Sequence, residues 1–418
     1  MKIRSMLRQG AAMAGVVGVS FTLGATAANA QSFVPIPDGA SVSIPSGTTC
    51  NMSTEAPGVS DDLIKLGAFT PLTGPVAGPG LGAFEGQEYV FDKVNAAGGL
   101  NGRKIKFVAL DDQYSAAYAQ QQVRRLVERE KIFAISGGIG TPNFVAVLPY
   151  IDKNQIPSIG MYAPAAGKVG TMKNPHVYMI WPSFVSEFNV IADYVARTDP
   201  DASIALLMQS GDVGNDALQG MEAALERHGR KIDKILRTEA TTTDYLPIAQ
   251  QLKEIGADWV FMVIQPTGIG QAIGSMMKIG YNPKVATPSD ETDESFISAF
   301  PEEVEGITTP TKVAALTSDD PKVRAFVEDF TAVNGKAPSM WNTVGFAQAM
   351  VTIEALQAAP ALTRDCLELA LQHMQGFETG VLPPVTFSPN SRQGTNAVGI
   401  ARVEDGVVVQ VSPPVLVQ

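Results

Sequence analysis

The chain is poor in the side chains on which many catalytic and metal sites depend. Its 418 residues include only three histidines and two cysteines, and 17% are charged. So few Cys and His residues argue against a zinc site and exclude a disulfide-dense scaffold. Beyond the first thirty residues, no continuous apolar run is long enough to span a membrane. The chain is nevertheless long and apolar enough, at 45% hydrophobic residues, for two lobes with sizeable cores.

Positive charge is also scarce, with 31 Lys and Arg against 42 Asp and Glu and a formal net charge of −11. Such an acidic body argues against nucleic acid or an anionic membrane surface as a partner. Neither a P-loop nor a G-x-S-x-G motif occurs. His176, His228 and His373 lack a neighbouring nucleophile motif, so we interpret them as surface or hydrogen-bonded residues. We therefore expect neither enzymatic activity nor a cofactor.

The first thirty residues have the pattern of a signal peptide. Three basic residues precede an uncharged apolar stretch at 11–27, and Ala-Asn-Ala follows at 28–30. The stretch is short and rich in Gly, Ala and Ser, which disfavours the alternative of a membrane anchor. We expect the mature chain to begin at Gln31 and to be soluble and extracytoplasmic, most simply periplasmic.

Export affects the interpretation of Cys50 and Cys366. An even number of cysteines in an oxidising compartment favours a disulfide, and two separate buried thiols are the alternative. Cys50 lies in an expected extended leader, residues 31–60, which is rich in Ser, Pro, Gly and Thr over much of its length. A bond would tie this leader to a late helix.

Short β-branched runs alternate with amphipathic stretches from residue 64 onward, and the alternation restarts near residue 187. This pattern predicts an α/β protein with two Rossmann-like lobes, each built on a parallel sheet. Three helices and a hairpin around Asp405-Gly406 are expected to end the chain. The expected strands are 64–69, 105–111, 133–137, 158–161, 203–208, 232–239, 259–264, 397–403 and 407–411. The expected helices are 83–97, 116–130, 142–154, 187–197, 214–229, 246–256, 267–280, 321–334, 343–358 and 363–374.

A loose G-x-G-x-x-A pattern at residues 78–83 follows the first strand. Read as a dinucleotide fingerprint it is weak, because Pro79 lies inside the turn and bare glycine patterns are common. Export also argues against a nicotinamide enzyme. We therefore do not assign a nucleotide site to this segment.

Two longer motifs flank the first expected helix. Pro-Leu-Thr-Gly-Pro-Val-Ala at 71–77 follows the first strand, and Asn-Ala-Ala-Gly-Gly-Leu-Asn-Gly at 95–102 follows the helix. With the order of elements over about 61–411, they resemble type I periplasmic solute-binding proteins of ABC importers, in the leucine/isoleucine/valine-binding group. The resemblance implies two lobes joined by three crossings, with the ligand between them. Lobe one would comprise 61–181 and 309–384, and lobe two 182–308 and 385–418.

The resemblance also implies which residues bind the ligand in lobe one. Gly140 and Thr141 follow a strand, with Thr141 expected as the N-cap of a helix and Pro142 as its first residue. Family members use a Ser or Thr here for a ligand carboxylate; a capping role alone is the alternative. Tyr162 and Ala163 follow the next strand, where relatives carry hydroxyl residues.

In lobe two, an acidic residue of the family pairs with the ligand ammonium. Asp290 matches it best by spacing, and Glu291 is the neighbouring alternative; a solvated acidic loop without a ligand role is the other alternative. Positions that are often aromatic or tyrosine in relatives are Pro79, Val213 and Gln265 here, so a standard α-amino acid is in doubt. Further apolar walls are expected from Trp181, Trp341 and Phe184.

We therefore expect a receptor that delivers a small organic solute to an ABC permease, acting as a monomer. The family default is a branched-chain or other apolar amino acid. An aromatic or terpenoid acid or a small amide is the alternative ligand. A sensor that presents its ligand to a membrane kinase is the alternative role.

Overall fold

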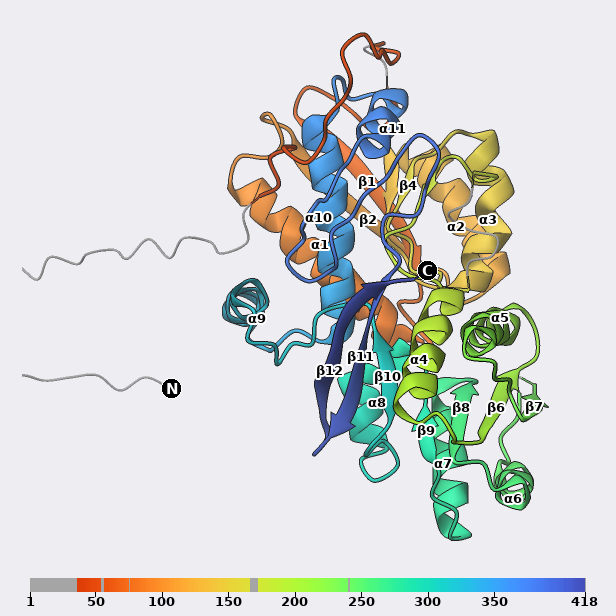
Figure 1. Cartoon of the computed structure of the whole chain (residues 1–418). Helices are drawn as coiled ribbons and strands as arrows, with labels where there is room; N and C mark the ends of the chain where they lie inside the picture. Colours follow the sequence, from red (N-terminus) through yellow and green to blue (C-terminus); the bar gives the residue numbers. More distant parts are fainter. Residues whose placement is uncertain (1–35, 54–55, 75, 166–171, 240, 418) are drawn as a thin grey trace, which may run out of the picture.

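The structure, a computed structural model, describes residues 36–53, 56–74, 76–165, 172–239 and 241–417. The expected signal peptide at 1–30 lies outside the described residues. Figure 1 shows two lobes, one above the other. The chain passes between them after β5, after β10 and before β11.

Lobe one contains a parallel sheet of five strands in the order β2-β1-β3-β4-β5. The strands are β1 (Leu63–Thr70), β2 (Lys104–Asp111), β3 (Ala134–Ser136), β4 (Ser158–Ile159) and β5 (Val177–Tyr178). The helices are α1 (Ala77–Ala96), α2 (Ala116–Arg125), α3 (Thr141–Lys153), α9 (Pro321–Asn334), α10 (Met340–Ala358) and α11 (Arg364–Gln372). Parallel strands with helical cover are buried on both faces, which explains why β1 is almost entirely apolar.

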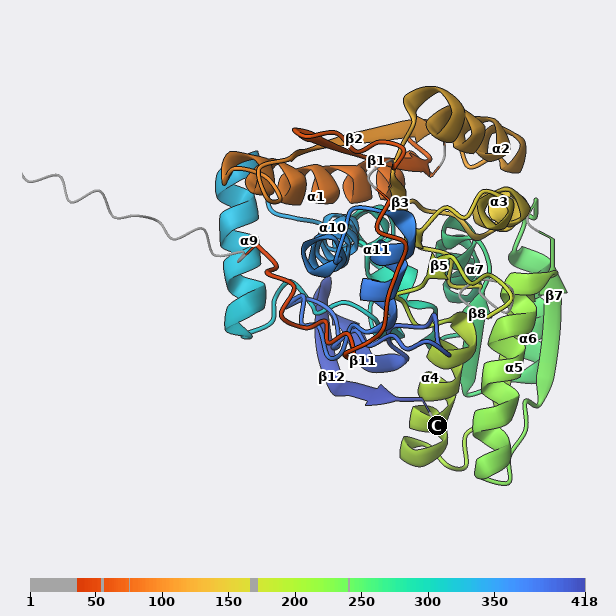
Figure 2. The same cartoon turned by 90° about the horizontal axis from the view of Figure 1, so that it is seen from above.

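Helices α1 and α10 lie side by side although the chain separates them by more than two hundred residues (Figure 2). Glycines at their contact let the backbones approach. A Cβ on Gly86 would lie 2.1 Å from the Asn342 carbonyl oxygen, and one on Gly345 would lie 1.9 Å from the Ala83 carbonyl oxygen. This close packing places the first turns of α1 and α10 beside each other at the edge of lobe one.

Lobe two contains a mixed sheet of seven strands in the order β12-β11-β10-β9-β8-β6-β7. The strands are β6 (Ile204–Gln209), β7 (Lys234–Thr238), β8 (Trp259–Val263), β9 (Lys284–Ala286), β10 (Thr308–Thr311), β11 (Ala397–Glu404) and β12 (Val407–Leu416). The helices are α4 (Phe184–Thr198), α5 (Asp212–Arg227), α6 (Leu246–Ile255), α7 (Pro266–Lys278) and α8 (Glu294–Ala299), with a 3₁₀ turn, η2 (Ser289–Thr292), before α8.

Side chains of β6 alternate between two cores, as the period of a strand requires. Ile204, Leu206 and Met208 pack in the core that also contains residues of α4 and α5. Ala205 and Leu207 pack in the core that contains residues of α6 and α7. The sheet therefore has an apolar core on each face, and the expected α/β class is confirmed.

The described part of the leader runs along lobe one and is extended. The carboxylate of Glu354 in α10 accepts hydrogen bonds from the amides of Gly39 (2.9 Å) and Ser41 (2.7 Å). Cys50 and Cys366 form a disulfide across 316 residues of chain. The leader is therefore attached to α10 and α11 at separate points, and the expected disulfide is present.

Three expectations differ from the structure in detail. Residues 78–83, read as a possible glycine turn, lie inside α1, which begins at Ala77 because Pro79 is compatible with a first helical turn. The expected helix at 116–130 ends as a five-residue π-helix, Leu126–Glu130. The two-residue strand β5 was not expected, because its apolar run is short and continues into the crossing. The expected lobe boundaries remain a prediction.

Candidate functional site

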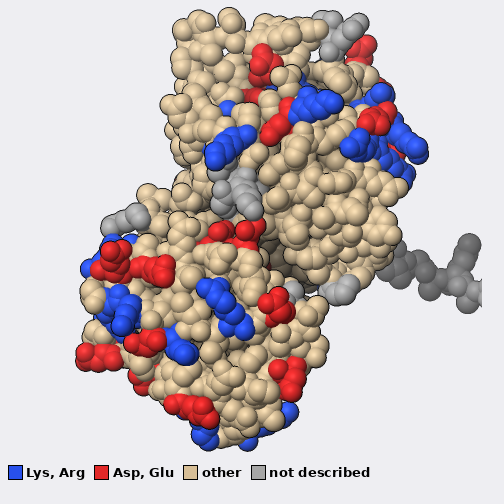
Figure 3. All heavy atoms as spheres, turned by 90° about the vertical axis from the view of Figure 1, so that its right-hand side faces the viewer, with Lys and Arg blue, Asp and Glu red and all other residues tan. Residues whose placement is uncertain are grey.

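A cavity of about 440 Å³ lies between the two lobes. Figure 3 shows the molecule narrowing between its two parts, with a hollow there. Segments that follow β2, β3 and β4 line it from lobe one, and segments that follow β6, β8 and β9 line it from lobe two. The carboxyl ends of parallel strands in both sheets therefore face one space, which is where doubly wound sheets bind ligands. The lining includes Val76, Pro79, Tyr114, Ile139, Gly140, Thr141, Tyr162, Phe184, Gln209, Val213, Gln265, Asp290, Glu291, Phe296, Phe300 and Trp341.

Helix α3 begins at the lobe-one wall of the cavity. Gly140, not Thr141, is the N-cap, and Thr141 and Pro142 are the first two helical residues. The expectation that Thr141 caps the helix was therefore wrong. The residue at the cap has a φ of 122°, which glycine adopts without strain. A Cβ on Gly140 would also lie 2.9 Å from the Tyr114 ring. Thr141 still lines the cavity at a helix N-terminus, where N–H groups without helical acceptors favour an anion.

Tyr162 forms the centre of an aromatic cluster. Its ring centroid lies 5.5 Å from that of Trp181 and 5.1 Å from that of Trp341, edge to face in the second case. Trp181 lies behind the cavity wall and donates its indole N–H to the Gly160 carbonyl at 2.9 Å. Tyr162 and Trp341 line the cavity, while Trp181 and the buried Ala163 do not. The cluster fixes the wall where lobe one approaches lobe two.

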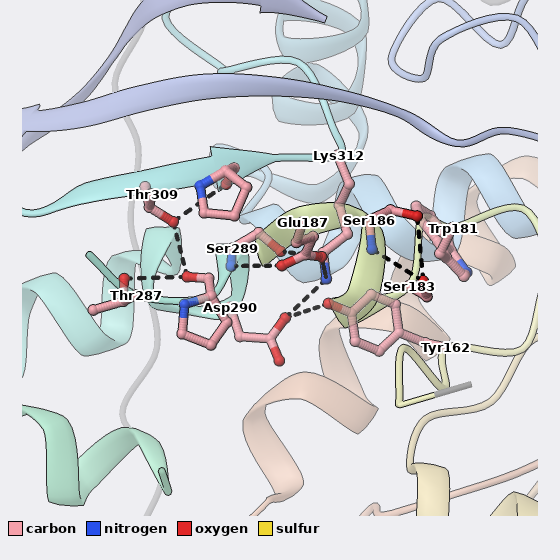
Figure 4. Close-up of polar contacts among 12 residues, drawn as sticks. Tyr162, Trp181, Ser183, Ser186, Glu187, Thr287, Ser289, Asp290, Thr309 and Lys312 are labelled. Carbon is pink, nitrogen blue, oxygen red and sulfur yellow. Dashed lines mark hydrogen bonds and ion pairs between the residues drawn. The ribbon is translucent and has the colours of Figure 1, made fainter. Parts of the chain in front are cut away.

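A buried charged cluster forms the facing wall (Figure 4). The ammonium of Lys312, just after β10, lies 3.0 Å from a Glu187 carboxylate oxygen and 3.1 Å from Asp290 Oδ1. Glu187 also accepts hydrogen bonds from the amide and hydroxyl of Ser289. Tyr162 donates its hydroxyl to the same Asp290 oxygen, so this contact joins the lobes.

Burial and neighbouring charges shift the pKa values of the groups in this cluster. Burial alone would lower the pKa of Lys312, but Asp290 and Glu187 outweigh it and raise the pKa above its usual value. Burial raises the pKa of Glu187, although Lys312 opposes the shift. Burial, reinforced by Asp290, also raises the pKa of Glu291 well above its usual value. Burial and neighbouring charges therefore favour the protonated forms of Lys312 and Glu291.

Glu291 differs from Asp290 in its partners. Its side chain is 2% exposed, it lines the cavity, and its Oε2 has no hydrogen-bond partner among the described residues. Asp290 is partly exposed to the cavity, and its Oδ1 is occupied by Tyr162 and Lys312. Both acidic candidates therefore reach the cavity, but their hydrogen-bond partners differ.

Eight of the ten residues expected to bind ligand line the cavity. They are Pro79, Gly140, Thr141, Tyr162, Val213, Gln265, Asp290 and Trp341. Phe184, the additional wall candidate, lines it as well. Their roles toward a ligand remain predictions.

Several site residues were not expected from the sequence. Tyr114 and Gln209 follow or end strands β2 and β6, so the rule of strand carboxyl ends could have found them. For Lys312 and Glu187 the sequence contained one indication of a buried role, because each is a charged residue inside an apolar run. Phe296 of α8 had none, because the position of α8 depends on the packing of lobe two.

The three histidines all have polar partners away from the cavity. His176 lies 2.6 Å from Glu368, His228 lies 2.8 Å from Asp193, and His373 Nδ1 lies 3.2 Å from the Leu369 carbonyl. Within the described ranges, no group of three or more His, Cys, Asp or Glu residues is placed to hold a metal. No helix in the same ranges is both long and apolar enough to cross a membrane.

Comparison with known proteins agrees with this geometry. A family model described as "Periplasmic binding protein" matches residues 63–407. The Leu/Ile/Val-binding protein homolog 6 of Brucella suis is 26% identical over 363 residues, covering 82% of this chain and 89% of the relative.

Two solved structures share the fold. A fatty acid ABC transporter substrate-binding protein from Thermomonospora curvata has a TM-score of 0.76 at 22% identity, covering 87% of this chain and 94% of its own. A branched-chain amino acid ABC transporter protein from Thermus thermophilus, with bound valine, has a TM-score of 0.75 at 18% identity, covering 86% of this chain and 97% of its own.

Two doubly wound lobes share a cavity at the carboxyl ends of their strands, which is where such sheets bind ligands. The family match covers most of the chain, and the chain belongs to the periplasmic binding protein family, in its type I leucine/isoleucine/valine-binding group. This is a family of solute-binding proteins.

Proposed function

We propose that the protein is a periplasmic receptor that captures a small organic solute between its lobes and delivers it to an ABC permease. The observation that carries the proposal is the cavity of about 440 Å³, lined from both sheets at their carboxyl ends. Its walls are mostly apolar, with a few polar groups from Thr141, Gln265 and Asp290. Such a surface suits a small molecule with an apolar body and polar ends.

Contacts from both lobes let binding drive closure. A ligand shifts an equilibrium only by its difference in affinity for the two states. Thr141 and Trp341 line the cavity from lobe one, and Val213 and Asp290 line it from lobe two. A ligand that touches both sets binds the closed form better, and a permease can then distinguish loaded from empty receptor.

A thermal-shift screen of the mature protein tests the proposal. The panel contains amino acids, aromatic acids, fatty acids, terpenoid acids and small amides. A ligand at ~100 times its Kd stabilises the folded state by about 2.7 kcal/mol. A matched pair of variants locates the site. Val213→Trp fills the cavity and abolishes the shift, while Val333→Trp on exposed α9 retains it.

An uptake experiment in cells distinguishes a role in transport from a role in sensing. A strain that lacks the receptor loses uptake of the labelled ligand if the receptor serves a permease. Uptake that continues while a transcriptional response disappears favours a sensor for a membrane kinase. We also propose that the receptor acts as a monomer, which light scattering of the mature protein checks.

A further inference from the structure

The side chain of Asp290 already has a cation within the protein. Lys312 is 1% exposed at its side chain, and its ammonium lies 3.1 Å from Asp290 Oδ1. The same ammonium lies 4.3 Å from the centroid of the Tyr162 ring. Tyr162 also donates to Asp290 Oδ1, so that oxygen has two donors from the chain itself. A ligand ammonium would compete with both of them.

The other buried acidic groups near Asp290 have donors within the chain. Glu187 is fully buried and takes three donors, two from Ser289 and one from Lys312. Asp293 is 7% exposed and accepts the amide of Ser295 at the start of α8. Burial raises the pKa of Glu291 well above its usual value, which favours its uncharged form. Lys312 thus lies between the carboxyl groups of Glu187 and Asp290, and it is the cation that already faces Asp290.

We propose that Lys312 is a built-in counter-ion for Asp290, and that the cleft therefore selects apolar carboxylic acids that carry no ammonium group. This inference rests on the proposed function and names its ligand class. A ligand ammonium at Asp290 would approach the ammonium of Lys312, which lies 3.1 Å from Oδ1 of the same carboxylate. Like charges at such distances are costly where water is excluded.

The rest of the cavity suits such an acid. The carboxylate belongs at the N-terminus of α3, where Thr141 lines the cavity. Its apolar body lies against Tyr114, Tyr162 and Trp341 from lobe one and Phe296 from lobe two. The second Asp290 oxygen and the carboxyl group of Glu291 remain for a hydroxyl group, when the ligand has one.

Matched ligand pairs test the inference with the wild-type protein. Phenylalanine is compared with 3-phenylpropanoate, and leucine with 4-methylpentanoate, by calorimetry at pH 7. Each pair shares its skeleton and carboxylate and differs only in the ammonium. We expect the acid of at least one pair to bind tenfold or more tightly than its amino acid. An amino acid that binds as well as or better than its partner overturns the inference and leaves the proposed function standing.

Lys312→Met tests the residue itself. The change keeps most of the side-chain length and removes the ammonium, so Asp290 becomes free for a ligand cation. We expect the preference for the acid to narrow by tenfold or more, or to reverse. Lys322→Met, at an exposed position on α9, is the control and keeps the wild-type preference.

Other outcomes also have defined meanings. An unchanged preference in a folded Lys312→Met protein overturns the role of Lys312. If that variant does not fold, the wild-type pairs still decide the ligand class. Tight binding of 3-phenylpropanamide with none of the acids overturns the carboxylate assignment. If no member of the wider screening panel binds, the proposed function fails together with this inference.

Discussion

Adjacent carboxylic acids in the cleft have different physical roles. Asp290 is held by Lys312 and Tyr162, whereas Glu291 has an oxygen without a partner and lies in a desolvated position. A carboxylate without a cation is expensive to bury, so burial raises the pKa of Glu291. The difference between the two carboxyl groups comes from their positions relative to Lys312 and not from the residue type.

Substitution of these two residues should therefore have unequal effects on stability. Asp290→Asn removes the charge that faces Lys312, and we expect a loss of about 1–3 kcal/mol, because Lys312 keeps Glu187 as its partner. Glu291→Gln keeps the size of a side chain whose raised pKa favours the uncharged form, and we expect a change within about 0.5 kcal/mol. Urea denaturation at pH 7 measures both. Equal losses would show that Glu291 is ionised in the folded protein.

Asp112 makes a pH-dependent contribution at the lobe-one wall. It is fully buried, its Oδ1 accepts the amide of Tyr114, and burial raises its pKa to about 6. The unfolded value is near 4, so the folded state binds the proton more tightly. The stabilisation from this group is complete below about pH 4 and is lost as pH rises to about 6.

The variant Asp112→Asn isolates this contribution because it cannot titrate. We expect the stability of wild type relative to this variant to fall between pH 4 and 6 and to level off above. Parallel stability curves over pH 3.5–7.5, from urea denaturation, provide the measurement. A relative stability that rises over the same interval would mean that the folded protein favours the carboxylate. Asp405→Asn, in an exposed hairpin turn, is the control.

At the scale of the element, the capping role and the expected binding role at the start of α3 belong to different residues. Because Gly140 occupies the cap, the hydroxyl of Thr141 is available to the cavity at the first helical position. Thr141→Val keeps the shape and removes the hydroxyl. With an acid that binds the wild type, we expect affinity to fall by about 1.5–3 kcal/mol, since the lost hydrogen bond is to a charged group.

Stability of the ligand-free protein provides the contrast for this variant. We expect Thr141→Val to unfold at nearly the wild-type temperature, because the cap is unaltered. Calorimetry gives the affinity, and a thermal melt without ligand gives the stability. Unchanged affinity with a lowered melting temperature would assign Thr141 a structural role alone.

At the scale of the whole molecule, the disulfide joins the leader to α11, a late helix of lobe one. Cys50 and Cys366 are separated by 316 residues, so the bond restricts the unfolded chain over a long loop. Chain-entropy arguments give about 2–5 kcal/mol for removing such a bond. We expect the double variant Cys50→Ala, Cys366→Ala to unfold at lower denaturant concentration while ligand affinity is kept.

The reason for retained affinity is that the leader contacts the face of lobe one at α10 and α11, away from the cavity. Dithiothreitol should lower the stability of wild type and leave the double variant unchanged. A loss of ligand affinity in the double variant would show that the leader influences the cleft.

Most of the architecture followed from local patterns. Strands such as β1 and β6 are short apolar runs between turn signals, and helix α9 has the expected bounds at both ends. The Asp405-Gly406 hairpin also forms, with positive φ at both residues. These features depend on neighbours in the chain, so periodicity and turn chemistry were sufficient to predict them.

The amino-acid sequence alone determined the fold class, the disulfide partners and several residues of the cavity wall, because strand ends are local features and parallel sheets gather them at one edge. Only the tertiary structure decided what the wall does chemically. Glu187 comes from α4, Asp290 from η2 and Lys312 from the crossing after β10, and Tyr162 reaches Asp290 from lobe one. Their protonation follows from burial and from distances near 3 Å, which exist only once the two lobes are packed.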